Sequence, residues 1–248
     1  MITICLLTIH PKGVEAIRSE MEHGLEVNPE GAGWAILCNG SVHSGKGLNG
    51  KFELDTYLLL REKMGNPPGV FHARLATAGR GLGYSGCHPL DVPGTDLKVF
   101  HNGTLPGEFW DADDPRSDTR QFAEDWLPGR AAWASEGTLA AKLADMIGPF
   151  NKMVLAGPRG LLVINEQEFL TTPEGALHSN ADYLGQGEGW DEMTIGGDLY
   201  RYNLPQPGQC ETCNRLSCAG KAECDGTRQK HPPRWRNESA RRASLAVA

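Results

Sequence analysis

Long apolar runs and a secretory start are both missing from this sequence. No stretch of its 248 residues is apolar over the ~20 residues that a helix needs to cross a bilayer. The first residues, Met1–Ile9, lack the basic start and the small-residue cleavage site of a signal peptide. We therefore expect a cytoplasmic protein with no membrane partner. Its length is sufficient for one main globular core.

The cysteines do not come in an even number, which disfavours a framework of disulfides. Of the seven, Cys5, Cys38 and Cys87 stand apart, and four crowd into a C-x2-C-x4-C-x5-C segment. In a cytoplasmic chain such a cluster indicates a metal site or free thiols before disulfides. Its compactness resembles a zinc knuckle, and four thiolates would satisfy tetrahedral zinc. The alternative is four thiols without a ligand. The candidate zinc ligands are Cys210, Cys213, Cys218 and Cys224.

Positive charge is also scarce, with 24 Lys and Arg against 31 Asp and Glu and a net charge of −7. The charge is unevenly distributed along the chain. Eight basic and four acidic residues follow Cys210, so this part has a net charge of +4 and the rest of the chain has −11. The basic residues and Trp235 suit contact with nucleic acid, and a solvated basic tail is the alternative. We expect a folded core over residues 1–200 and a Cys-rich, basic tail over residues 201–248.

Hydrophobic periodicity predicts a mixture of strands and helices in the first 200 residues. A four-residue turn joins the last two predicted strands, an arrangement that indicates an antiparallel sheet. Predicted strands are Ile2–Ile9, Trp34–Cys38, Ser41–His43, Val70–Ala73, Leu97–His101, Lys152–Ala156 and Leu161–Asn165, with a hairpin turn at Asn39-Gly40. Predicted helices are Val14–Glu22, Leu54–Met64, Asp118–Trp126 after a Ser117 cap, and Thr138–Ile147.

The apolar run Val99–His101 stops abruptly on Asn102-Gly103. Such a stop places a side-chain amide beside an unencumbered backbone N–H at the end of a strand. Both groups are donors that can be aimed at a tetrahedral oxygen, as in an oxyanion hole. The alternative is an ordinary hairpin turn, for which Asn-Gly is a common pair.

Arg74 and Asp118 are candidates for holding the two charges of a free α-amino acid. Arg74 would offer a bidentate fork to the carboxylate, and Asp118 a charge-assisted acceptor to the ammonium. Each also has a simpler explanation. Arg74 would make a surface salt bridge, and Asp118 would be an acidic residue in the first turn of a helix, where the helix dipole favours it.

Taken in order, several motifs make the chain resemble the class II glutamine amidotransferases, which are amino-terminal nucleophile (Ntn) hydrolases. The chain looks most like the short, stand-alone members found in actinobacteria and their phages. The resemblance covers roughly Met1 to Tyr183. The motifs are Cys5-Leu6-Leu7-Thr8, Asn28-Pro29-Glu30-Gly31-Ala32-Gly33, Phe71-His72-Ala73-Arg74-Leu75-Ala76-Thr77, Cys87-His88-Pro89, His101-Asn102-Gly103-Thr104-Leu105 and Ser117-Asp118-Thr119.

The resemblance implies an α+β fold, a four-layer αββα sandwich with two antiparallel sheets. It implies hydrolysis of the L-glutamine side-chain amide without a catalytic cofactor, with the ammonia passed to a separate acceptor enzyme. Cys5 would be the nucleophile, and Asn102 with the Gly103 N–H the oxyanion hole. Arg74 would bind the glutamine carboxylate and Asp118 its ammonium. Thr77 would also contact the substrate.

Two departures from the family pattern bear on activity. The first is Ala78, which stands where the family usually has a histidine. The second is at the amino terminus, where Met1–Ile4 precede Cys5. In the family the catalytic base is the free α-amine of the nucleophile itself. Four extended residues would place the amine about 14 Å from the thiol, too far to act as its base. Either the leader is removed or Cys5 is not amino-terminal. The rival functions are another γ-glutamyl amide hydrolase, and an inactive binding module that acts through the tail.

Overall fold

The computed structural model describes residues 5–75, 83–130, 137–184, 193–195 and 198–200. The chain divides into two units, Ile2–Gln186 and Gly187–Ala248, the latter grouped with Met1. In the second unit, β11 (Met193–Ile195) and β12 (Asp198–Tyr200) form an antiparallel pair. The predicted Cys-rich tail lies outside the described residues, so its zinc site stays a prediction.

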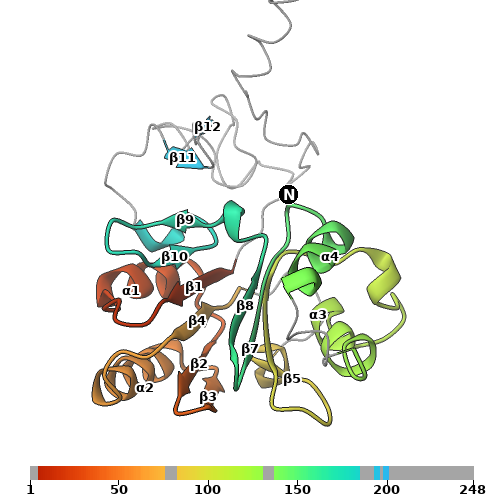
Figure 1. Cartoon of the computed structure of the whole chain (residues 1–248), viewed down its shortest axis with the longest axis horizontal. Helices are drawn as coiled ribbons and strands as arrows, with labels where there is room; N and C mark the ends of the chain where they lie inside the picture. Colours follow the sequence, from red (N-terminus) through yellow and green to blue (C-terminus); the bar gives the residue numbers. More distant parts are fainter. Residues whose placement is uncertain (1–4, 76–82, 131–136, 185–192, 196–197, 201–248) are drawn as a thin grey trace, which may run out of the picture. The chain divides into compact units, whose positions relative to one another are not determined.

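The first unit is α+β and contains two antiparallel sheets (Figure 1). The six-stranded sheet has the order β3 (Ser41–Gly47), β2 (Ala32–Cys38), β4 (Gly69–Ala73), β1 (Leu6–His10), β10 (Leu177–His178) and β9 (Leu170–Thr171). The four-stranded sheet has the order β5 (Leu90–Asp91), β6 (Lys98–Asn102), β7 (Lys152–Gly157) and β8 (Gly160–Ile164). The predicted antiparallel pairing of the last two long strands is confirmed.

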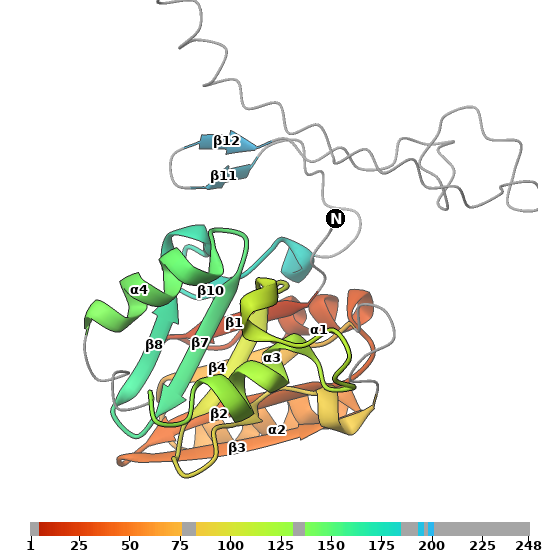
Figure 2. The same cartoon turned by 90° about the vertical axis from the view of Figure 1, so that its right-hand side faces the viewer.

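Helices cover the outer face of each sheet, so that the described residues of this unit form four layers. Figure 1 shows α1 (Arg18–Val27) and α2 (Gly50–Lys63) on one side of the strands. On the other side lie α3 (Asp118–Gln121), continued by a π-helical turn η3 (Phe122–Trp126), and α4 (Gly137–Ile147). Figure 2 looks onto α3 and α4 with strands behind them.

Three clusters of buried apolar side chains fill the spaces between these layers. Between α1, α2 and the six-stranded sheet lie Leu6, Met21, Ala32, Trp34, Ile36, Leu54, Tyr57, Phe71 and Ala73. Between the two sheets lie Leu7, Ile9, Ala35, Val70, Phe100, Val154, Ala156 and Phe169. The third cluster, which includes Val99, Phe122, Leu143 and Leu155, lies between the four-stranded sheet and its helices. Central strands are therefore apolar on both faces, which explains why Leu6–Ile9 and Met153–Ala156 read as nearly continuous apolar runs.

The alternation of side chains along β6 directs its last residues to different layers. Val99 belongs to the cluster under the helices, and Phe100 to the cluster between the sheets. By the same period, His101 points toward α3, where its Nδ1 lies 2.8 Å from Thr119 Oγ1. Asn102 points toward the six-stranded sheet, where its Nδ2 lies 2.6 Å from the Cys5 carbonyl oxygen.

Most predicted strands and helices are found, with shifted ends. The Asn39-Gly40 hairpin turn is confirmed, since both residues have positive φ and Cys38 pairs with Ser41. Ser117 caps its helix as predicted, accepting a hydrogen bond from the Arg120 N–H. The two-residue strands β5, β9 and β10 were not predicted, because so short a segment shows no periodicity.

The helix predicted over Val14–Glu22 is wrong at both ends, since α1 spans Arg18–Val27. Buried Arg61 on α2 explains the late start. Its guanidinium donates to the carbonyls of Pro11 and Val14, at 3.1 and 2.8 Å. The chain before α1 is therefore held in a non-helical conformation that leaves these carbonyls available to Arg61.

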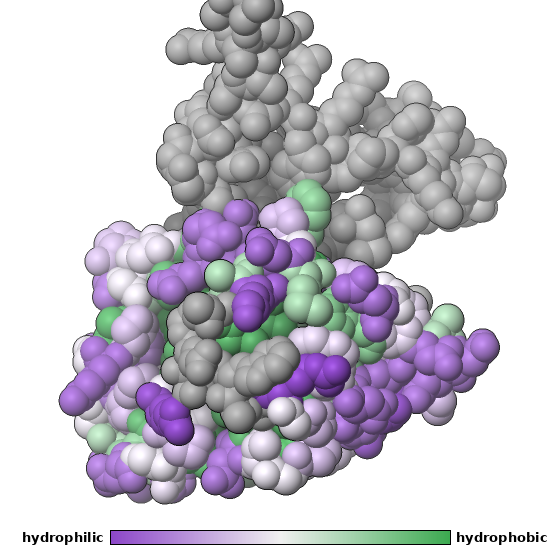
Figure 3. Space-filling view, turned by 45° about the vertical axis from the view of Figure 1, so that its right-hand side comes forward, coloured by the Kyte–Doolittle hydropathy of each residue, from purple (hydrophilic) through white to green (hydrophobic). Residues whose placement is uncertain are grey.

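The outer surface is largely polar. In Figure 3 hydrophilic side chains cover most of the face that is shown, and apolar ones appear in scattered patches. No helix among the described residues combines the length and apolar character needed to span a membrane. The large apolar side chains that are exposed in the described part of the chain are Leu48, Phe52, Leu59, Tyr84, Met146 and Phe150.

A close backbone approach holds the Cys87-His88-Pro89 segment against the six-stranded sheet. A Cβ placed on Gly33 of β2 would lie 1.9 Å from the His88 carbonyl oxygen, so only glycine fits there. Lys46 of β3 fixes the same segment by donating to the carbonyls of Cys87 and Pro89, at 3.0 and 2.9 Å.

We expect Gly33→Ala to reduce the free energy of unfolding by about 1–3 kcal/mol, because the methyl group can be accommodated only by moving backbone. Gly107→Ala is the control, since a Cβ there meets no atom within 4 Å. Chemical denaturation of the two variants would measure the difference. Equal stabilities would contradict the close approach.

Candidate active site

Cys5 lies immediately before β1, with its thiol against the backbone that follows β4. Its Sγ is 3.4 Å from the Leu75 carbonyl oxygen and accepts from the Leu75 N–H at 3.5 Å. Burial raises the pKa of the thiol to about 11, although the Leu75 N–H and the Arg74 charge act to lower it. At neutral pH the thiol therefore stays protonated and needs a base to become a nucleophile.

The carbonyl oxygen of Cys5 accepts hydrogen bonds from two side-chain amides. Asn102 donates from the end of β6 at 2.6 Å, and Asn180 from the segment after β10 at 2.9 Å. Ser179 connects Asn102 to β1, because its hydroxyl accepts from Asn102 Nδ2 at 2.7 Å and from the Leu7 N–H at 2.9 Å. The backbone of Cys5 is thus fixed by both sheets.

Ser179 and Asn180 were missed by the sequence analysis. They reach Cys5 from 174 and 175 residues along the chain. The only signal that could have found them is the pairing of β10 with β1. Because β10 has two residues, that pairing leaves no recognisable pattern in the sequence.

Arg74 follows β4 and is buried beside the thiol. Its side chain donates to the Glu30 carbonyl at 3.2 Å, and its backbone exchanges hydrogen bonds with Gly31 and Glu30. Its charge lowers the thiol pKa values of Cys5 and of Cys87, although burial raises both overall. The prediction of a surface salt bridge is wrong, since this is a buried cation near two thiols.

Asn102-Gly103 is not a hairpin turn. The strand that it ends, β6, pairs with β5 and β7 and not with the residues that follow Gly103. Gly103 has φ +147, and a Cβ there would lie 2.1 Å from Asn151 Oδ1. Both amide hydrogens of Asn102 are donated, to Cys5 and Ser179. Contact with a substrate oxygen would require one of these bonds to be exchanged.

Asp118, at the start of α3, is connected to this strand end through its neighbours. One carboxylate oxygen accepts from the Leu105 N–H at 2.7 Å, and the other from the Thr119 N–H at 2.7 Å. Thr119 also contacts His101 Nδ1 at 2.8 Å, and His101 Nε2 lies 2.9 Å from Asn151 Oδ1. His101 therefore bridges α3 to the loop before β7 and fixes the position from which Asn102 projects.

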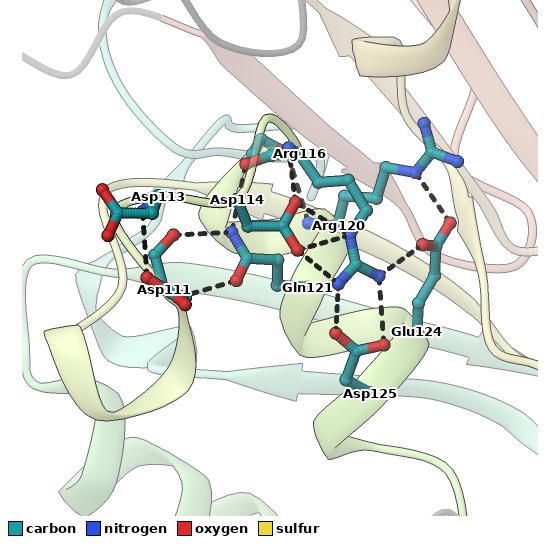
Figure 4. Close-up of polar contacts among 9 residues, drawn as sticks. Asp111, Asp113, Asp114, Arg116, Arg120, Gln121, Glu124 and Asp125 are labelled. Carbon is teal, nitrogen blue, oxygen red and sulfur yellow. Dashed lines mark hydrogen bonds and ion pairs between the residues drawn. The ribbon is translucent and has the colours of Figure 1, made fainter.

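An ion-pair network holds the helix that begins with Asp118 (Figure 4). Arg116 pairs with Asp114, Glu124 and Asp125 at 2.7, 2.9 and 2.5 Å. Arg120 adds a second bond to Glu124 at 2.7 Å. Arg116 thus links Asp114 of the acidic turn before Ser117 to Glu124 and Asp125 of η3.

Three buried histidines lie between Arg74 and α3. His72 donates from Nε2 to the His101 carbonyl at 3.3 Å, and His88 Nδ1 accepts from the His101 N–H at 3.2 Å. The rings of His72 and His88 lie 4.3 Å apart. Burial lowers all three pKa values, that of His72 to about 3, so these rings are neutral at pH 7.

The structure therefore brings Cys5, Arg74 and Asn102 together, with Gly103 and Asp118 joined to them through the His101 network. Thr77 and Ala78 lie outside the described residues, as do Met1–Ile4. Within the described part of the chain, no group of three or more His, Cys, Asp or Glu side chains is arranged to hold a metal ion.

No protein-family model matches this chain, and no curated protein matches it. Among solved structures, it is similar to the glutamine phosphoribosylpyrophosphate amidotransferase of B. subtilis, solved with ADP and GMP. The TM-score is 0.42 and the identity 14%, over 71% of this chain and 41% of that one. The chain thus spans about two fifths of that protein's length.

Acid should destabilise this protein below about pH 6.5. The unfolded histidines take up protons there, whereas His72 and His88 stay neutral in the fold, so stability falls by about 1.4 kcal/mol per pH unit for each. Thermal unfolding between pH 7.5 and 5.0 would measure this loss. His72→Gln should show a shallower dependence on pH, and a midpoint that stays constant over this range in the wild type would contradict the assignment.

Proposed function

We propose that this chain hydrolyses the side-chain amide of L-glutamine to glutamate and ammonia, as an Ntn-type amidohydrolase of the class II amidotransferase kind. One observation carries the proposal. Cys5, which immediately precedes β1 of the six-stranded sheet, accepts a hydrogen bond at its carbonyl from Asn102 at the end of β6 in the other sheet, and the buried Arg74 acts on its thiol. A thiol, a cation and an amide donor from three distant segments meet at one place.

In the proposed reaction, the thiol proton moves to a base and the thiolate attacks the amide carbon of glutamine. The C–N bond then breaks, and the nitrogen leaves as ammonia after taking the proton back from the base. Water hydrolyses the γ-glutamyl thioester and regenerates the thiol. The base is the α-amine of Cys5, so activity requires the removal of residues 1–4.

The other residues have roles in binding. Arg74 pairs with the substrate carboxylate and Asp118 with its ammonium, while Thr77 adds a contact. The Gly103 N–H and the Asn102 amide stabilise the oxyanion once Asn102 exchanges a hydrogen bond. We further propose that the ammonia is consumed by a separate acceptor enzyme.

Intact mass spectrometry should find Cys5 as the first residue of the active protein. A glutamine analogue with an electrophilic carbon should then add one label per chain, at Cys5. Cys5→Ala should release no ammonia from glutamine and take no label, and Cys38→Ala is the matched control. Labelling at Cys38 or Cys87, or hydrolysis of other γ-glutamyl amides but not of glutamine, would contradict the proposal.

Arg74→Lys should raise KM for glutamine by about 10- to 100-fold and change kcat much less. An ammonium keeps the charge but loses the paired hydrogen bonds, which are worth about 1.5–3 kcal/mol. Steady-state ammonia release would give both constants, with Arg159→Lys in the exposed β7–β8 turn as the control. A loss confined to kcat would argue against carboxylate binding.

A further inference from the structure

β10 runs antiparallel to β1, and the segment after it continues along the same strand. The register pairs Ile9 with Leu177 and Thr8 with His178. The pairing continues beyond the strand, because the Ser179 N–H donates to the Leu7 carbonyl at 2.8 Å. Asn180 follows, and its Nδ2 donates to the Cys5 carbonyl at 2.9 Å, so this segment leads toward the start of β1. Asp182 begins the short 3-10 turn η6 (Asp182–Leu184) that comes next.

The carboxylate of Asp182 is fixed in this position. It accepts from Asn28 Nδ2 at the end of α1, at 3.1 Å. The Asp182 N–H donates to Asn180 Oδ1 at 3.1 Å, and the same Asn180 donates from Nδ2 to the Cys5 carbonyl. Asp182 is thus tied to the backbone of Cys5 through a single side chain. Burial raises its pKa, against the hydrogen bonds from Asn28 and Asn180.

Three charged side chains from different elements act on Cys5. Arg74, after β4, lowers the thiol pKa, whereas Asp182 and Glu30, which precedes β2, raise it. Asp182 comes from the segment that also binds the Cys5 carbonyl. It is therefore an acidic group that both acts on the thiol and is linked to the backbone of Cys5 through Asn180.

We propose that Asp182 is a positioning residue that orients the α-amino group of Cys5 and stabilises its ammonium form. This inference rests on the proposed function, in which that amine is the base. When the proton moves from Sγ to the amine, a thiolate and an ammonium are formed, and the carboxylate keeps its charge throughout. Nucleophile, base and orienting acid then correspond to the arrangement of a catalytic triad.

The test is Asp182→Asn, which preserves the shape of the side chain and removes its charge. Without the anion, the ammonium form is less stable, so the pKa of the amine should fall by about 0.5–2 units. The acid limb of kcat/KM for glutamine should move to lower pH by the same amount, and kcat should fall by about 10- to 100-fold. Glu53→Gln is the matched control. Glu53 is also a buried carboxyl, and it accepts a hydrogen bond from Trp34, which lies on the helix-covered face of β2.

A second readout does not depend on glutamine. The full chain whose intact mass begins at Cys5 is treated with an amine acylating reagent at a series of pH values, and modification of the Cys5 amine is followed by peptide mass spectrometry. A lower apparent pKa in Asp182→Asn than in the wild type and Glu53→Gln supports the proposal even if glutamine is not the substrate. Unchanged amine titration, or a chain that keeps residues 1–4, overturns it.

Discussion

The hydrogen bonds to one backbone carbonyl, that of Cys5, hold this site together. Asn102 reaches it from the four-stranded sheet and Asn180 from the end of β10. A carbonyl oxygen has two lone pairs, so these two amides satisfy it completely. Because the residue that carries the thiol is fixed from both sheets, the position of this proposed nucleophile depends on how the sheets pack and not on one loop.

The same strand that supplies Asn102 also connects the site to the opposite helix layer. Alternation along β6 sends His101 to α3 and Asn102 to Cys5. His101 is neutral, since burial lowers its pKa, and it bridges Thr119 and Asn151. The distance between Asp118, the proposed ammonium-binding residue, and Cys5, the proposed nucleophile, is therefore set by a buried polar network, in which unpaired groups would be costly.

Local signals were sufficient to predict much of this fold. Apolar runs indicated the long strands, and the Asn-Gly pair at residues 39–40 gave the correct hairpin because positive φ suits both residues. The same pair at Asn102-Gly103 ends a strand without making a hairpin. Sequence alone left these two possibilities open, since the residue that pairs with Asn102 is Lys152 of β7, 50 residues away.

The sequence by itself determined the α+β class, the antiparallel β7–β8 pairing, and Cys5, Arg74, Asn102, Gly103 and Asp118 as candidate site residues. Only the tertiary structure decided that Ser179, Asn180 and Asp182 belong beside Cys5, and that α1 begins after Val14. The physical reason is the same in both cases. Hydrogen bonds from Asn180 and Arg61 join residues far apart in the chain, and no local periodicity records such contacts.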